Sequence, residues 1–197
     1  MRAMSRSTRE IEIKLPFATA EDAVLRLTAI GARPASGRVF EDNRILDDDG
    51  RSLSRAGKLL RVRTAGDRAV LTVKAPVESD TRHKVREEIE VDVEDAGASL
   101  RLLERLGFRT IWRYQKYRST FTLPGLEATV DETPIGCFVE LEGDPRAIDR
   151  TAADLGFPAD RYVTATYREL AEEHAARSGR DVEGILVFLP EAEEDRS

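Results

Sequence analysis

The sequence predicts an α+β domain built on an antiparallel β-sheet. About eight short segments alternate apolar and charged residues with a period of two, which indicates strands with one apolar face. Only four segments have helical periodicity, too few to supply the crossover helix that each parallel strand pair requires. Turn sequences separate several strands, and Gly66-Asp67 between two of them predicts a hairpin.

Each expected strand is an alternating segment. In the first, Glu10, Glu12 and Lys14 alternate with aliphatic residues. The charged side chains therefore share one face of the strand, and the aliphatic side chains share the other. Later segments repeat this pattern with other charged residues. The expected strands cover about residues 9–15, 39–47, 58–64, 68–75, 84–93, 112–122, 126–131 and 136–142.

The first three expected helices have a capping residue before them and a glycine after them. The last has Tyr167 and Leu170 three residues apart on one side. The helices cover about residues 19–30, opened by Thr19 and ended by Gly31; 95–106, opened by Asp95 and ended by Gly107; 145–155, opened by Asp144-Pro145 and ended by Gly156; and 164–177, which begins at Thr164.

The composition predicts one globular domain with appendages. The chain has 197 residues, of which 41% are hydrophobic and 35% charged, so a substantial core is expected. We expect the domain over residues 9–178, a disordered segment over 1–8, and an extension over 179–197 that ends in an acidic tail. The net charge of −6 argues against general affinity for nucleic acid or for an anionic membrane.

Cysteine usage and hydropathy restrict the class of protein further. Cys137 is the only cysteine, which excludes an internal disulfide and a Cys-rich zinc site. No apolar run approaches the roughly 20 residues of a membrane span, and no secretory h-region is visible. We therefore expect a cytoplasmic protein, with monomer and homodimer both open.

The charged faces of the expected strands have an unusual composition. Long cationic and acidic side chains occur on most strands, whereas Thr, Ser and Gln, common on solvated strands, are scarce. Acidic residues recur as i, i+2 pairs at 10/12, 88/90 and 140/142, and clustered carboxylates repel one another unless a cation is bound. The charged positions are Glu10, Glu12, Lys14, Arg61, Arg63, Lys74, Lys84, Arg86, Glu88, Glu90, Lys116, Arg118, Asp131, Glu140 and Glu142.

Two interpretations of these faces are open. An antiparallel sheet with one solvated face also alternates charged and apolar residues, with opposite charges paired across strands. If the sheet closes instead, the charged side chains point into a lumen. That lumen would be prohibitively cationic when empty and would suit a polyanionic ligand. Its carboxylates would bind hard cations such as Mg²⁺ or Mn²⁺ through oxygen.

In their order along the chain, these residues resemble the motifs of the CYTH superfamily, also called triphosphate tunnel metalloenzymes. The resemblance spans about residues 9–172. Ile45 and Leu46 depart from the family pattern, in which an aromatic residue often precedes the equivalent of Asp47. The matching motifs are Glu10-Ile-Glu-Ile-Lys14, Leu60-Arg-Val-Arg63, Thr72-Val-Lys74, Arg86-Glu-Glu-Ile-Glu90, Lys116-Tyr-Arg118, Asp131 with Phe138-Val-Glu-Leu-Glu142, and Thr166-Tyr-Arg-Glu-Leu170.

The resemblance implies an eight-stranded antiparallel closed β-barrel that binds a small-molecule triphosphate with two divalent metals, Mg²⁺ or Mn²⁺. It implies catalytic roles for Glu10, Glu12, Lys14 and Lys74. The implied metal ligands are Glu10, Glu12, Glu88, Glu90, Asp131, Glu140 and Glu142. The implied substrate-binding residues are Lys14, Arg61, Arg63, Lys74, Arg86, Lys116 and Arg118.

Three hypotheses for the function follow. The first is a metal-dependent triphosphatase that hydrolyses inorganic triphosphate, thiamine triphosphate or a nucleoside triphosphate. The second is a class IV adenylate cyclase that converts ATP to cyclic AMP and pyrophosphate, which needs an adenine pocket that the sequence does not reveal. The third is a non-catalytic module that binds polyphosphate or nucleotide.

Other residues near the motifs are expected to have structural roles. Trp112 and Tyr114 are expected to pack on the exterior of the barrel. His83 lies between two basic residues and is expected in an exposed loop. The helix over 164–177 is expected to cover one end of the tunnel.

Overall fold

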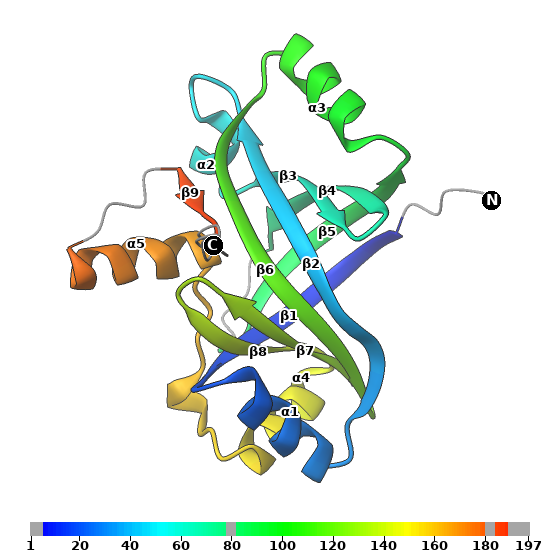
Figure 1. Cartoon of the computed structure of the whole chain (residues 1–197), viewed down its shortest axis with the longest axis vertical. Helices are drawn as coiled ribbons and strands as arrows, with labels where there is room; N and C mark the ends of the chain where they lie inside the picture. Colours follow the sequence, from blue (N-terminus) through cyan, green and yellow to red (C-terminus); the bar gives the residue numbers. More distant parts are fainter. Residues whose placement is uncertain (1–5, 78–81, 180–183, 189–197) are drawn as a thin grey trace, which may run out of the picture.

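Eight antiparallel strands close into a barrel in the computed structural model, which describes residues 6–77, 82–179 and 184–188. Around the ring the order is β2-β3-β4-β5-β1-β8-β7-β6, and β6 pairs with β2 to close it (Figure 1). The predicted fold class is therefore confirmed. The strands are β1 Arg6–Phe17, β2 Arg33–Asp47, β3 Leu59–Ala65, β4 Arg68–Pro76, β5 Lys84–Val93, β6 Arg109–Leu123, β7 Leu126–Thr133 and β8 Gly136–Gly143.

Strands β2 and β6 are longer than the alternation predicted. β2 begins at Arg33 rather than near residue 39, and β6 begins at Arg109 rather than near residue 112. The two strands pair with each other from end to end, with register shifts that lie mostly in the first half of β2. Such irregularities bend a strand and interrupt the period-two pattern. The sequence pattern therefore identified only the regular parts of these strands.

The four predicted helices form, and their caps explain where they begin. Thr19, Asp95 and Asp144 each accept a backbone hydrogen bond from the first turn of the helix that follows. Thr166 and Glu169 form a capping box, so the last helix begins at Tyr167. The sequence had predicted a start at residue 164. The helices are α1 Ala20–Ala29, α3 Ala96–Arg105, α4 Pro145–Asp154 and α5 Tyr167–Ser178.

Three short elements were not predicted, because each is too short to show a periodic pattern. They are helix α2 Ser52–Arg55, the 3₁₀ turn Ala159–Arg161, and strand β9 Ile185–Leu186, which pairs with β6 in parallel. β9 lies inside the predicted C-terminal extension, and β1 begins inside the segment predicted to be disordered. Residues 1–5 and the acidic tail from residue 191 lie outside the described residues.

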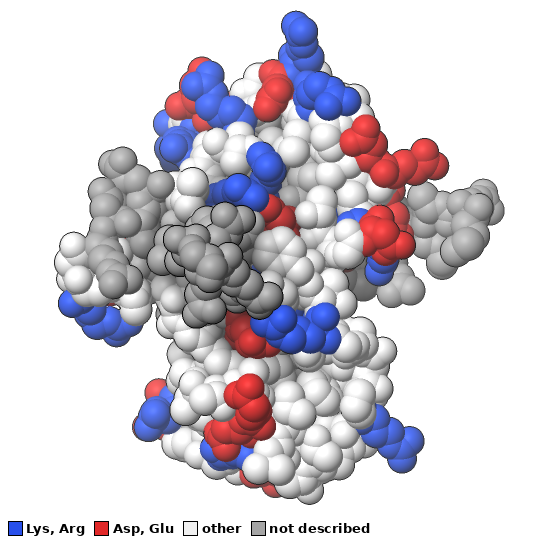
Figure 2. Space-filling view, viewed as in Figure 1, with Lys and Arg blue, Asp and Glu red and all other residues white. Residues whose placement is uncertain are grey.

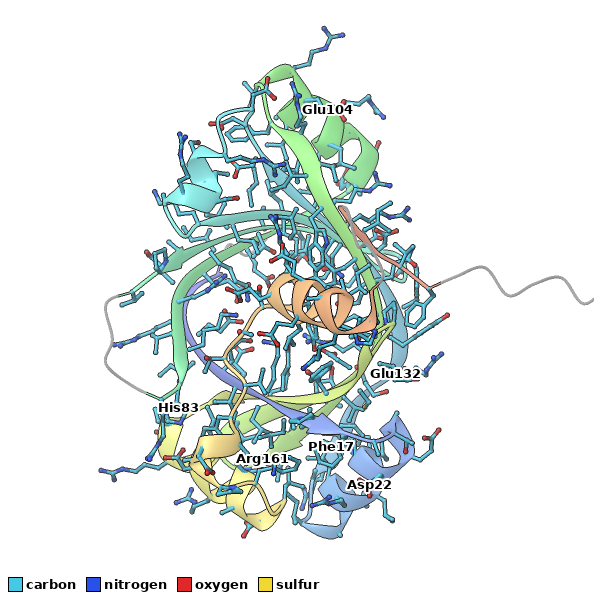
Figure 3. All side chains as sticks on the ribbon, turned by 90° about the vertical axis from the view of Figure 1, so that its left-hand side faces the viewer. Phe17, Asp22, His83, Glu104, Glu132 and Arg161 are labelled. Atoms are coloured by element: carbon cyan, nitrogen blue, oxygen red, sulfur yellow. The ribbon has the colours of Figure 1, made fainter. Side chains whose placement is uncertain are left out.

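The main hydrophobic core lies between the outer surface of the barrel and helices α1 and α4. Leu15 of β1, Val139 and Leu141 of β8 and Ile148 of α4 are fully buried there. Each buried aliphatic side chain of this size contributes about 1.5–3 kcal/mol. Because the aliphatic faces point outward to the helices, the charged faces point into the barrel (Figure 3). The interpretation as a sheet with a solvated charged face is therefore wrong.

Charged side chains of both signs lie on the described surface (Figure 2). On the face drawn in Figure 2, the coloured acidic and basic side chains are interspersed rather than gathered by sign. Of the helices that the structure describes, none has the length and apolar character needed to cross a membrane.

Candidate active site

The charged faces of the strands meet inside the barrel, where they line a cavity of about 780 Å³. Every predicted site residue except Asp131 lines this cavity. Asp131 lies behind its wall and is 0% exposed. Helix α5 crosses one end of the barrel (Figure 3), and Tyr167 and Arg168 of this helix line the cavity. The prediction that this helix covers one tunnel end is confirmed.

Most cations of the cavity are already paired with carboxylates. Lys14 Nζ lies 3.3 Å from Glu140 Oε1, and the Arg63 guanidinium lies 3.3 Å from Glu90 Oε1. The expectation of a strongly cationic empty lumen is therefore wrong, because the wall neutralises its own charge. Arg86 is an exception, since no carboxylate of the described residues forms an ion pair with it. Its guanidinium is free to receive an anionic ligand.

One member of each Glu-x-Glu pair is held by cations. Glu90 and Glu140 accept hydrogen bonds from arginines, and Glu12 Oε1 lies 2.8 Å from Lys84 Nζ and 3.5 Å from Lys14 Nζ. Burial alone would raise the pKa of Glu12, but Lys14 and Lys84 outweigh it and lower the pKa to about 2. These three carboxylates hold the lysines and arginines of the wall in place.

The other member of each pair joins a carboxylate triad, formed by Glu10, Glu88 and Glu142. One oxygen from each lies within 4.8 Å of the other two. Glu10 is 4% exposed, and its Oε2 has no hydrogen-bond partner. Withdrawal from water and the negative charges of Glu10, Glu12 and Glu88 raise the pKa of Glu142 to about 8, although its side chain reaches solvent. A divalent cation would relieve this repulsion through the oxygen ligands that Mg²⁺ prefers.

Asp131 does not reach the carboxylate triad. Its carboxylate accepts hydrogen bonds from Lys116 Nζ at 2.8 Å, from Arg118 Nε at 2.6 Å and from the Tyr167 hydroxyl at 2.7 Å. A fully buried carboxylate with three donors fixes the positions of those donors. The structure therefore places Asp131 as the anchor of two cavity cations and of helix α5.

Lys84 and Glu41 are two charged residues that were absent from the predicted site. Lys84 lines the cavity two residues before Arg86, and Glu41 is buried in β2 behind the lining residues. Lys116 and Arg63 lie within 4.0 Å of Glu41, and these cations with Arg118 outweigh burial and lower the pKa of Glu41 to about 2. The alternation of β5 already placed Lys84 in phase with Arg86. Glu41 lacked such a signal, because the alternation of β2 is weak there.

The placement of Trp112 and Tyr114 on the barrel exterior is wrong. Both side chains are buried and line the cavity beside Ile45. The two rings stack with centroids 4.8 Å apart, and the Tyr114 hydroxyl accepts a hydrogen bond from Arg61 at 3.4 Å. Residues 112, 114, 116 and 118 share one face of β6, so the period-two alternation already indicated that Trp112 and Tyr114 point the same way as Lys116 and Arg118. One end of the cavity therefore has an aromatic wall.

The expectation of an exposed loop for His83 is also wrong. His83 is 7% exposed, and its Nε2 lies 2.9 Å from Asp149 Oδ1 of α4. Tyr162 donates to the same carboxylate oxygen at 3.2 Å. Figure 3 shows His83 beside the segment that carries α4, where β5 begins. The contact with α4 could not be read from neighbouring residues, because Asp149 lies 66 positions further along the chain.

The fold and the site together define a class of tunnel protein, a closed eight-stranded barrel with acidic and basic side chains facing one lumen. A family model described as the CYTH domain matches residues 8–176. The chain belongs to the CYTH domain family. The resemblance seen in the sequence motifs is thus confirmed, and so is its implied fold.

Two archaeal proteins are similar to this chain. The Methanocaldococcus jannaschii protein named "Putative adenylate cyclase MJ0240" is 28% identical over 134 residues, which are 68% of this chain and 75% of that protein. The solved structure of PH1012 from Pyrococcus horikoshii has a TM-score of 0.71 and 24% identity. The match covers 82% of this chain and 98% of the PH1012 chain.

A solved structure from Hippeastrum covers more of the chain. It is described as "Putative adenylyl cyclase HpAC1 from Hippeastrum reveals a dominant triphophatase activity". It has a TM-score of 0.57 and 20% identity, and covers 94% of this chain and 98% of its own. At these identities the two solved structures support the fold alone.

Proposed function

We propose that this protein is a divalent-metal-dependent triphosphatase that hydrolyses a triphosphate compound inside the barrel. The observation that carries the proposal is the carboxylate triad in a cavity whose wall also carries several lysines and arginines. A triphosphate with a bound cation has this same pairing of charges. The name of the M. jannaschii relative and the triphosphatase activity described for the Hippeastrum protein support a nucleotide or triphosphate substrate.

The carboxylate triad is the set of residues that fits Mg²⁺ or Mn²⁺, because it offers several oxygens, one of them unpartnered. When bound there, such an ion supplies a Lewis acid and lowers the pKa of a water molecule. We propose one ion at this site rather than the two implied by the resemblance. A second would require Glu12 or Glu140 to leave its lysine and arginine partners.

The cations of the wall bind and orient the triphosphate. Arg86 lines the cavity and has no ion-pair partner among the described residues, so its guanidinium has donors available for phosphate oxygens. Lys116 and Arg118 are held by Asp131 and keep their charge directed into the cavity. Fixed positive charges of this kind stabilise the charge that develops on phosphate oxygens during transfer. No side-chain nucleophile is needed.

Adenylate cyclase activity is a second candidate, and the aromatic wall is the observation in its favour. Trp112, Tyr114 and Ile45 offer an apolar surface for a flat base beside the cations. The same surface would also serve a triphosphatase that prefers a nucleotide. The third hypothesis, a binding module without catalysis, does not by itself explain three close carboxylates.

Separating the products distinguishes these functions. The purified protein is incubated with inorganic triphosphate, thiamine triphosphate or ATP in the presence of Mg²⁺ or Mn²⁺, with Glu88→Gln as the control variant. Orthophosphate that depends on the metal and is lost in Glu88→Gln supports the proposal. Cyclic AMP with pyrophosphate supports the cyclase instead. If the protein binds these compounds but forms no product from any of the three, the non-catalytic binding module is supported.

A further inference from the structure

The Lys74 side chain occupies the carboxylate triad in the free protein. Its Nζ lies 2.5 Å from Glu10 Oε1 and 3.2 Å from Glu88 Oε1, so it bridges two of the three members. The Lys74 side chain is 13% exposed, and Lys74 lies opposite Glu88 in the pairing of β4 with β5. Among the described residues, no other cation pairs with Glu10. The ammonium group therefore stands where a metal ion would find its ligands.

An ammonium group and a divalent cation compete for such a site. A metal ion that binds Glu10 and Glu88 approaches their oxygens to about 2.0–2.6 Å. Two like charges this close repel strongly where the side chains are largely buried, as Glu10 and Lys74 are. The Oε2 of Glu10 has no hydrogen-bond partner and the Glu142 carboxyl group has no ion-pair partner among the described residues, so both can bind the ion before the ammonium leaves.

After it leaves the triad, the Lys74 ammonium can reach a second part of the cavity wall. Arg61 donates to Thr72, which lies two residues before Lys74 on the same face of β4. Arg61 therefore lies beside Lys74 in the cavity wall. The flexible stem of a lysine allows its ammonium to turn from the carboxylate triad toward a phosphate group bound near Arg61.

We infer that Lys74 couples the binding of the metal to the binding of the triphosphate. In the free protein Lys74 neutralises the carboxylate triad; when the metal binds, the ammonium is released and pairs with the phosphate chain. This inference rests on the proposed metal site. Because coupling between two ligands is reciprocal, each ligand strengthens the binding of the other through Lys74.

The first test measures Mn²⁺ binding without triphosphate, by calorimetry or by the spin resonance of the free ion. We expect Lys74→Gln to bind Mn²⁺ about tenfold more tightly than the wild type, equivalent to about 1.4 kcal/mol, because the competing ammonium is gone. Lys116→Gln is the matched control. It removes a cavity lysine that contacts Glu41 and Asp131 rather than the triad. Lys74→Met is a second variant in case Lys74→Gln does not fold.

The second test measures inorganic triphosphate affinity with and without Mn²⁺. Lys74→Gln should lose little affinity without metal, because the wild-type ammonium is then engaged with the triad, and about tenfold with metal. Equal losses in the two conditions would overturn the inference and make Lys74 a simple phosphate ligand.

A failure of the proposed metal site and a failure of the role of Lys74 give different results. If the wild type binds Mn²⁺, and Glu142→Gln weakens that binding, but Lys74→Gln matches the wild type, then the metal site stands and the role of Lys74 is overturned. If neither the wild type nor Lys74→Gln binds Mn²⁺, then both the metal site and the inference fall.

Discussion

Lys84 and Glu12 lie directly opposite each other in the pairing of β5 with β1, and the Lys84 ammonium donates to Glu12 Oε1 at 2.8 Å. Lys14 approaches the same oxygen at 3.5 Å. Glu12 thus contacts two lysines of the wall, whereas Glu10, two residues earlier, belongs to the carboxylate triad. The two glutamates of one short motif have different tasks, and this difference can be measured.

Glu12→Gln should destabilise the protein and leave the metal site intact. The free energy of unfolding should fall by about 1–3 kcal/mol, because Lys84 and Lys14 lose a charged acceptor while Lys14 keeps Glu140. Urea unfolding checks the stability, and Mn²⁺ titration should give an affinity close to that of the wild type. A large loss of Mn²⁺ affinity would place Glu12 among the ligands.

Glu142→Gln should have the opposite profile. Its carboxyl group belongs to the triad, has no ion-pair partner among the described residues and, with a pKa raised to about 8, is mostly protonated near pH 7 without metal, so glutamine changes the charge of the free protein little. We expect unchanged or higher stability without metal and at least a tenfold loss of Mn²⁺ affinity, about 1.4 kcal/mol. Chelated and Mn²⁺-loaded samples of both proteins, compared by thermal unfolding, test this. Equal stabilisation by Mn²⁺ in the two proteins would contradict it.

Glu41 should make stability depend on pH in the acid range. Its pKa falls from about 4.5 in the unfolded chain to about 2 in the folded protein, so the unfolded state binds protons first as pH falls. The stability from Glu41, up to about 3 kcal/mol, is therefore present above pH 4.5 and lost as pH falls towards 2. Glu41→Gln should cost most near pH 7 and little near pH 2. A cost that does not vary with pH in urea unfolding would refute this role.

The alternation of charged and aliphatic residues predicted the regular parts of the eight barrel strands and which side chains share a face, whereas the closure of the sheet into a barrel was implied by the family resemblance. The alternation placed Lys14, Lys74 and Glu140 on the charged faces of their strands, because side-chain direction in a strand depends only on position. It could not separate Glu10 from Glu12 in function. That separation depends on which residue of β5 or β8 lies opposite each glutamate, and one strand does not determine the register of the next.

The exterior position predicted for Trp112 and Tyr114 was wrong because a general expectation about aromatic residues outweighed the period-two alternation of the strand. Trp112 and Tyr114 are in phase with Lys116, and only the tendency of aromatic rings to pack in cores suggested another face. The metal-ligand role of Asp131 was implied by the family resemblance and stays a prediction. Its burial under Lys116 and Tyr167 depends on how α5 packs against β7, which no single strand pattern reveals.

Tyr167→Phe should loosen the helix that covers the tunnel without changing the metal site. The hydroxyl donates to Asp131 Oδ2 at 2.7 Å in a fully buried setting, and the loss of such a bond costs about 1–3 kcal/mol. Amide exchange should speed up in α5 more than in β1, with Mn²⁺ affinity unchanged. Uniform exchange rates across the two elements would show that this hydroxyl does not hold the helix.

Trp112→Ala should separate substrates that carry a base from those that do not. If a base lies on the aromatic wall, removing the indole takes away its contact surface, and stacking of a base on an aromatic side chain is worth about 1–3 kcal/mol. The KM for ATP should then rise about tenfold, equivalent to about 1.4 kcal/mol, whereas the KM for inorganic triphosphate stays close to the wild-type value. Tyr114 stacks on Trp112, so Tyr114→Phe serves as the control that keeps the ring. A parallel rise in both KM values would mean that Trp112 shapes the cavity as a whole, and that the base binds elsewhere or is absent from the natural substrate.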